Sequence, residues 1–229
     1  MTAPITETMW TWKLNWGQVR DDFVVGSCPM TPSDIDAIQA GTGATAILSV
    51  QCDECRSALR IDLEALIDHA GRRGLLLVNA PMRDFDVEDQ RRHLVDAVVN
   101  LAWLLSAGHR VYVHCTAGIN RAPLTVLGYL TFVEGLRHGE ALALVRAGRP
   151  QAEPYWEAWR GCRSDLVEQN RPAIEARAWD LSQRHPEARA PENWSRAEVE
   201  VIRERLLAIA GSTGLRSGPN SGDAGPQVG

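Results

Sequence analysis

Short, continuous apolar runs alternate along the chain with longer segments in which apolar residues recur every three or four positions. The continuous runs are typical of strands buried on both faces and lie at 22–26, 44–50, 75–78 and 111–113. The periodic segments predict amphipathic helices at 31–40, 61–73, 88–106, 121–134, 138–147, 156–167, 171–184 and 194–209. This alternation predicts an α/β fold whose central, mostly parallel sheet is flanked by helices.

The same pattern divides the chain into four predicted parts. They are a tryptophan-rich leader, an α/β domain, a C-terminal helical extension packed on that domain, and a tail, at 1–20, 21–170, 171–210 and 211–229. The tail is rich in glycine and serine without an apolar period, which predicts disorder. In the leader, Trp10, Trp12 and Trp16 are expected either to pack over the core or to offer a flat binding platform.

Composition narrows the class of protein. The 229 residues suffice for one substantial core, and a hydrophobic content of 45% with 23% charged residues is ordinary for a soluble globular protein. The net charge of −5 excludes nucleic acid and anionic membrane as main partners. The first residues resemble neither a signal peptide nor a transit peptide, so we expect a cytoplasmic protein. One lysine beside abundant arginine favours a bacterial source.

Five cysteines, an odd number without a secretion signal, favour free thiols in a reducing compartment. Cys52 and Cys55 form a single C-x-x-C pair. Without a second pair of ligands, the sequence favours an ordinary loop over a zinc or redox site. Another hypothesis is that Cys28 or Cys52 captures an oxidised Cys115 as a disulfide and protects it from further oxidation.

The most informative stretch is VYVHCTAGINRAP, residues 111–123. It predicts a buried strand, a loop of small residues and the start of a helix, with Cys115 at the turn. Backbone N–H groups of such a loop can curl round an anion, and the positive end of the helix points toward it. Arg121 adds a planar fork of donors that suits two phosphoryl oxygens. The surrounding positive charge favours the thiolate of Cys115, which makes it a candidate nucleophile.

Cys115 and Arg121, with five residues between them, resemble the Cys-x-x-x-x-x-Arg signature of the protein tyrosine and dual-specificity phosphatases. That resemblance implies Cys115 as nucleophile and Arg121 as the phosphate-binding arginine. It also implies a phosphate-binding role for the motif residues His114, Thr116, Ala117, Gly118, Ile119 and Asn120. No metal or other cofactor is expected, because the loop and the arginine supply the charge stabilisation.

Such a phosphatase needs an acid that protonates the departing oxygen. The segment RDFD, residues 83–86, follows a predicted strand and precedes a long helix, which places two carboxylates on a loop beside the site. We predict Asp84 as this general acid, whereas Asp86 lies closer to the helix and suits a capping role. The two remain alternatives, because geometry decides such an assignment.

Four segments in order, VGSCPMTPSDIDAI, QCDE, RDFD and VHCTAGINRAP, together with PENWSRAEVEVIRERLLAI near the end, resemble the plant starch-excess-type glucan phosphatases and, more distantly, laforin. The resemblance implies a phosphoglucan or related phosphosugar as substrate, held by the catalytic domain itself. It implies that Phe85 lines the cleft and that Trp16 contributes an aromatic surface. Ala122, in place of the usual hydroxyl residue, is shared with the glucan enzymes and is expected to slow the second, hydrolytic step.

Two departures from the glucan pattern favour other substrates. Asn120 replaces a glycine and is expected to narrow the cleft floor, and Ala58 and Leu59 replace an aromatic pair. Flat aromatic faces bind sugar rings, so this loss reduces the glucan-binding surface. A phosphoprotein phosphatase of dual specificity is therefore the alternative. A non-catalytic phosphate- or carbohydrate-binding module is a third hypothesis.

Overall fold

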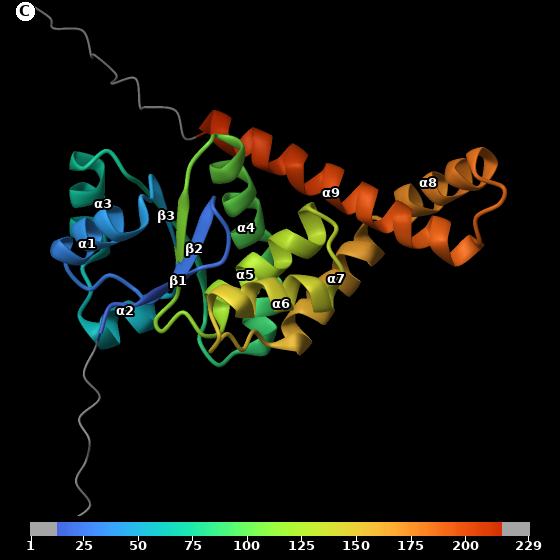
Figure 1. The fold of residues 1–229 in the computed structure, drawn as a ribbon. Helices are drawn as coiled ribbons and strands as arrows, with labels where there is room; N and C mark the ends of the chain where they lie inside the picture. Colours follow the sequence, from blue (N-terminus) through green and yellow to red (C-terminus); the bar gives the residue numbers. More distant parts are fainter. Residues whose placement is uncertain (1–12, 217–229) are drawn as a thin grey trace, which may run out of the picture.

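A computed structural model describes residues 13–216. Its centre is one five-stranded sheet in the order β1-β2-β5-β3-β4 (Figure 1). The strands are β1 (Trp16–Gln18), β2 (Phe23–Gly26), β3 (Ala46–Gln51), β4 (Leu76–Met82) and β5 (Val111–His114). Neighbouring strands run parallel except β1 and β2, which are antiparallel. The predicted α/β class with a mostly parallel sheet is therefore confirmed.

Helices cover both faces of the sheet (Figure 1). In chain order they are α1 (Pro32–Thr42), α2 (Asp53–Leu59), α3 (Leu63–Arg72), α4 (Val87–Ser106), α5 (Arg121–Gly128), the π-helix η1 (Tyr129–Val133), α6 (His138–Gly148) and α7 (Trp156–Gln169). Successive side chains of a strand point to opposite faces. Val24 of β2 accordingly joins the core beneath α1 and α3, while Phe23 and Val25 join the larger core beneath α4 and α5.

Two short elements lie outside the predicted pattern. β1 is formed by part of the tryptophan-rich leader and spans three residues, and α2 spans seven residues around the C-x-x-C pair, where the sequence suggests a loop. A segment of that length is too short to show a period. The helix expected over 121–134 changes from α to π geometry at Tyr129. β4 extends to Met82, beyond the end of the predicted strand at residue 78, and ends directly before the predicted acid loop.

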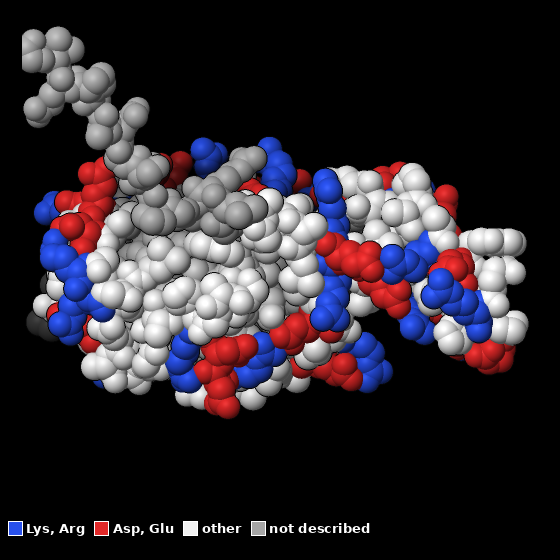
Figure 2. All heavy atoms as spheres, turned by 90° about the horizontal axis from the view of Figure 1, so that it is seen from above, with Lys and Arg blue, Asp and Glu red and all other residues white. Residues whose placement is uncertain are grey.

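The C-terminal extension consists of α8 (Arg171–Arg184) and α9 (Ala190–Arg216). They pair as a hairpin that projects from the domain, and the later part of α9 lies along α4 (Figure 1). The hairpin has a small core of its own, formed by Ile174, Leu181, Ala197 and Val201. Positive and negative side chains are interleaved along the projecting part, at the right of the view in Figure 2.

The predicted start of the tail is wrong, because α9 continues six residues beyond residue 210. Because packing against α8 stabilises the first part of α9, this helix can continue beyond the last residue that follows the apolar period. The remainder of the tail, like Trp10 and Trp12, lies outside the described residues. None of the helices within 13–216 combines the length and the apolar character needed to cross a membrane.

Candidate active site

Cys115 begins a six-residue loop between the end of β5 and the start of α5. Its side chain is only 3% exposed. Four consecutive carbonyl groups of this loop accept hydrogen bonds from outside: Thr116 from Cys28 N–H (3.0 Å), Ala117 and Gly118 from the Arg149 guanidinium (2.7 and 3.1 Å), and Ile119 from Glu153 N–H (2.7 Å). In a trans peptide the following N–H points opposite to the carbonyl. The loop amides are therefore turned inward, where they can surround an anion.

Gly118 allows the loop to take this shape. Its φ of +68° lies in the left-handed region, and an added Cβ would approach the Gly26 carbonyl oxygen to 2.5 Å. Only glycine meets both demands without cost. Arg149 is buried, so its charge stabilises the loop carbonyls at short range, although burial lowers the pKa of its guanidinium. The loop is thus held from its outer side by a segment more than 30 residues away in sequence.

Arg121 is fully buried and spans the space between the loop and the end of β4. Its Nη1 donates to the Met82 carbonyl (3.0 Å), and its Nη2 donates to Thr116 Oγ1 (3.1 Å) and to Asp84 Oδ2 (2.6 Å). Burial alone would lower its pKa, but the negative charges of Cys115, Asp84 and Cys55 outweigh that effect and raise it. The guanidinium therefore stays charged, and its donors face the same space as the loop amides.

The structure separates the two candidate acids. Asp86 is the N-cap of α4, and its Oδ1 accepts the N–H of Asp89 at 2.9 Å. Asp84 is turned instead toward Arg121. Phe85, between them, has a φ of +57° and is 84% exposed, a strained conformation for a bulky residue that is typical of functional loops. Asp89 Oδ2 fixes the loop by accepting the Arg83 N–H at 2.7 Å. Asp84 is thus the carboxylate that faces the loop of Cys115.

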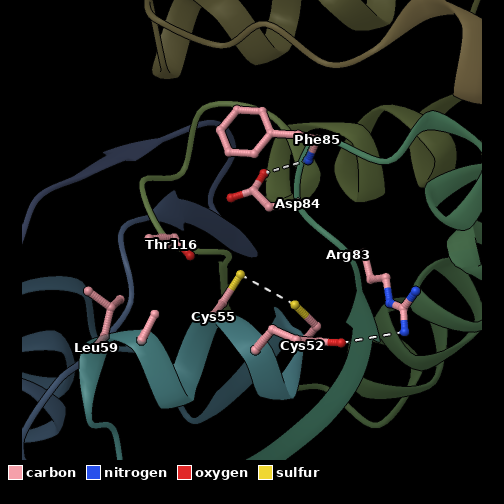
Figure 3. A pocket seen from close by; sticks show the side chains of 9 residues that line it. Cys52, Cys55, Leu59, Arg83, Asp84, Phe85 and Thr116 are labelled. Atoms are coloured by element: carbon pink, nitrogen blue, oxygen red, sulfur yellow. Dashed lines mark hydrogen bonds and ion pairs between the residues drawn. The ribbon is translucent and has the colours of Figure 1, made fainter.

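A cavity of about 540 Å³ opens between this acid loop and α2 (Figure 3). It is lined by Cys52, Glu54, Cys55, Ala58, Leu59, Arg83, Asp84, Phe85 and Thr116. An ion pair between Arg83 and Glu54 (3.4 Å) spans two of its walls. Ala58 and Leu59, predicted to occupy the position of an aromatic pair, do line the cavity. In the sequence, the wall contributed by α2 was marked by the QCDE segment and by Ala58 and Leu59.

Other predicted site residues lie away from the cavity. His114 is buried beneath the loop, its Nδ1 lies 3.1 Å from the Cys115 carbonyl, and burial lowers its pKa to about 4, so it is neutral at pH 7. Asn120 does not narrow the cleft floor as expected, because its Nδ2 donates to the Glu153 carbonyl at 3.0 Å. Trp16 packs beside Tyr112 and Gly41, on the face covered by α1. The structure therefore does not bring Trp16 to the cavity.

Two further aromatic side chains, Trp156 and Trp159, lie on α7. Trp159 is buried, and its Nε1 donates to Thr131 Oγ1 at 2.9 Å, so its ring serves the core. Trp156 stacks on it, with ring centroids 4.9 Å apart, and keeps an exposed face. The exposed ring of Trp156 is available to a ligand, whereas the buried ring of Trp159 is not.

The cysteines are all free thiols. Cys28 is buried, and burial raises its pKa to about 12, so it is an inert thiol in this state. Cys52 and Cys55 contact each other, with their sulfur atoms 3.3 Å apart. Across residues 13–216 no group of three or more His, Cys, Asp or Glu side chains is placed to hold a metal ion. Capture of Cys115 by Cys28 or Cys52 stays a prediction.

The fold, together with the anion-binding loop of Cys115, indicates a phosphatase. Comparison with known protein families leads to the same class. The family described as "Dual specificity phosphatase, catalytic domain" matches residues 38–162, more than half of the chain and including both Cys115 and Arg121. The chain belongs to this family.

Among the relatives of the chain is a protein named as a phosphoglucan phosphatase. The chain is 30% identical over 168 residues to phosphoglucan phosphatase DSP4 of Castanea sativa, covering 72% of the chain and 44% of that protein. It is 26% identical over 149 residues to laforin of Mus musculus, covering 60% of the chain and 44% of laforin. The matched part thus spans less than half the length of these relatives.

Solved structures share the fold. The active form of Tk-PTP superposes with a TM-score of 0.52 at 22% identity, covering 65% of this chain and 94% of that one. A mouse putative dual specificity phosphatase complexed with zinc tungstate superposes with a TM-score of 0.52 at 20% identity, covering 72% and 96%. At this level of identity the likeness establishes the fold.

Proposed function

We propose that this protein is a cysteine-dependent phosphatase that hydrolyses phosphate monoesters, with phosphorylated glucan or a related phosphosugar as substrate. The single observation that carries the proposal is the shape of the Cys115 loop. Four of its carbonyl groups accept hydrogen bonds from outside, so its backbone amides point into the space that the Arg121 guanidinium also faces. Amides and a guanidinium arranged in this way match the three equatorial oxygens of a transferring phosphoryl group.

In the proposed first step, the Cys115 thiolate attacks phosphorus while the bond to the leaving oxygen breaks and Asp84 gives that oxygen a proton. In the second step, water attacks the phosphocysteine, Asp84 takes the proton of the water, and the thiolate departs. The 2.6 Å ion pair between Asp84 and Arg121 must open first, because substrate oxygens take over the arginine donors. Substrate binding thereby releases the acid beside the leaving group.

The printed name of one relative, a phosphoglucan phosphatase, supports a glucan or phosphosugar substrate. The cavity adds to this, since the exposed ring of Phe85 stands at its mouth and can stack on a sugar. The aliphatic side chains of Ala58 and Leu59 on the facing wall favour a second candidate, a phosphoprotein phosphatase, because they offer no flat surface to a sugar ring.

Phosphate release from three kinds of substrate tests the assignment: solubilised phosphoglucan, an aryl phosphate, and phosphopeptides that carry phosphotyrosine or phosphothreonine. We expect the aryl phosphate and the phosphoglucan to be hydrolysed, with higher kcat/KM for the glucan than for the peptides. Higher values for the peptides would replace the glucan proposal by the phosphoprotein one. Hydrolysis of none of the three would contradict the phosphatase proposal itself.

Asp84→Asn is expected to lower kcat about 100-fold on an ester with a poor leaving group, because it removes the proton donor. The loss should shrink on an aryl phosphate whose leaving group departs without a proton. Asp86→Asn is the matched control, since asparagine also caps a helix and should change kcat less than about twofold. Steady-state kinetics on both esters measure the effects. Equal losses in the two variants would contradict the assignment of Asp84.

A further inference from the structure

The mechanism above leaves two thiols of the cavity wall unused. Cys52 and Cys55 lie at the start of α2 with their sulfur atoms 3.3 Å apart, and both line the cavity beside Asp84 and Thr116 (Figure 3). Two thiols at contact distance need only a small movement to form a disulfide of normal length. Because both belong to one turn, that movement does not have to shift another element of the fold.

The environment of Cys55 favours reaction with an electrophilic sulfur. Partial burial would raise its pKa, but the hydrogen bond from Cys52 and the charge of Arg121, whose Nη1 lies 3.4 Å from Cys55 Sγ, outweigh burial and lower it. Burial raises the pKa of Cys52, which is 6% exposed. Cys55 is thus the more accessible sulfur and has thiolate character. Cys52 is its buried partner and stays protonated until the second step of the exchange.

We propose that Cys52 and Cys55 are a redox-active dithiol, a site of reversible oxidation by small-molecule disulfides, built into the wall of the phosphate cavity. The Cys55 thiolate attacks one sulfur of the small disulfide, forms a mixed disulfide and expels one thiolate. Cys52 then loses its proton to that thiolate and attacks the sulfur of Cys55, which expels the second thiolate. The protein is oxidised by two electrons, and the small disulfide is reduced to two thiols.

The oxidation state of this pair also reaches the phosphate site. In the reduced protein Cys55 Sγ accepts a hydrogen bond from Arg121 Nη1, so it competes with a bound phosphate for that donor. The disulfide carries no negative charge and is a weaker acceptor. Oxidation therefore removes a repelling charge from the cavity and frees one arginine donor, and we expect tighter phosphate binding. This consequence rests on the proposed role of Arg121, whereas formation of the disulfide does not.

The first experiment uses full-length Cys115→Ser protein, which lacks the other reactive thiol of the site. It is equilibrated with buffers of rising glutathione disulfide to glutathione ratio, quenched with acid, alkylated after unfolding and digested with trypsin. One tryptic peptide, residues 21–56, contains Cys28, Cys52 and Cys55. We expect this peptide to lose two alkyl groups while Cys28 keeps its own, and dithiothreitol to restore both.

The same protein with Cys55→Ser in addition is the matched control and should form no disulfide in this peptide. Alkylation of all three cysteines at the most oxidising ratio would overturn the proposal. Accumulation of glutathione adducts without the internal disulfide would overturn it too, because it would show that Cys52 does not reach Cys55.

Calorimetric titration of the reduced and oxidised Cys115→Ser protein with inorganic phosphate tests the link to Arg121. We expect the oxidised form to bind about threefold more tightly. Equal affinities would overturn the link while the disulfide itself stands. Absence of phosphate binding in both forms would count against Arg121 as the anion-binding group. That result would contradict the proposed function, and it would not affect the disulfide detected by mass spectrometry.

Discussion

Cys115→Ser is expected to lower kcat/KM by about 10⁴-fold or more, on every substrate that the wild-type protein hydrolyses. A serine hydroxyl stays protonated in the anion-binding loop near neutral pH, so it supplies no nucleophile, and no neighbouring base replaces that loss. Because Cys115 is buried and the substituted side chain is similar in size, the fold should be retained. Phosphate release under saturating and limiting substrate measures the loss.

Cys162→Ser is the control for this substitution. Cys162 is also a buried free thiol, but it lies on α7 and does not line the cavity, so its replacement should leave turnover close to that of the wild type. Thermal unfolding followed by circular dichroism shows whether each variant is folded at the assay temperature. Undiminished turnover by folded Cys115→Ser protein would refute the phosphocysteine mechanism.

Arg121→Lys is expected to lower kcat/KM about 10³-fold although the positive charge is kept. Arginine reaches the Met82 carbonyl with Nη1 and both Asp84 and Thr116 with Nη2, and a single ammonium group cannot occupy both positions. A phosphoryl group would therefore lose one of its paired donors in the transition state, where its charge is most spread. We expect the larger part of the loss in kcat.

Arg91→Lys provides the comparison for Arg121→Lys. Arg91 also makes a two-point contact, with Asp165 at 2.7 and 2.8 Å, but it lies on α4 outside the cavity and is half-exposed. Its replacement should leave kcat/KM within about twofold, because Arg91 does not line the cavity and an ion pair at the surface contributes little to stability. If Arg121→Lys retained more than a tenth of wild-type kcat/KM, bidentate phosphate binding by Arg121 would be excluded.

Several features could be predicted from sequence because they depend on residues close together along the chain. The apolar strand runs and the periodic helices require only local patterns, and they lead to the α/β class with its parallel sheet. α8 was predicted with the bounds that the structure gives, Arg171–Arg184. The strand, small-residue loop and helix around Cys115 form one continuous segment, so the spacing between Cys115 and Arg121 is evident from the sequence alone.

Other features depend on contacts between distant segments, which no local pattern specifies. The sequence favours Asp84 over Asp86 only because Asp86 lies closer to the helix. The approach of Arg121, 37 residues after Asp84, and the capping hydrogen bond of Asp86 decide between them. Arg149 lies 32 residues from the Ala117 carbonyl that it holds. The family resemblance likewise implied that Trp16 contributes an aromatic surface to the site, whereas in the structure Trp16 packs beside Tyr112.

By itself the sequence determined the fold class, the family and the identity of the candidate nucleophile and arginine, because those follow from short-range spacing and from the preference of apolar strands for burial. Only the tertiary structure decided which carboxylate faces the loop, which donors turn its amides inward, and that Cys55 lies beside Arg121. The physical reason is that hydrogen bonds and charge effects act over a few ångströms. Their partners are therefore fixed only when the packed core has brought distant segments together.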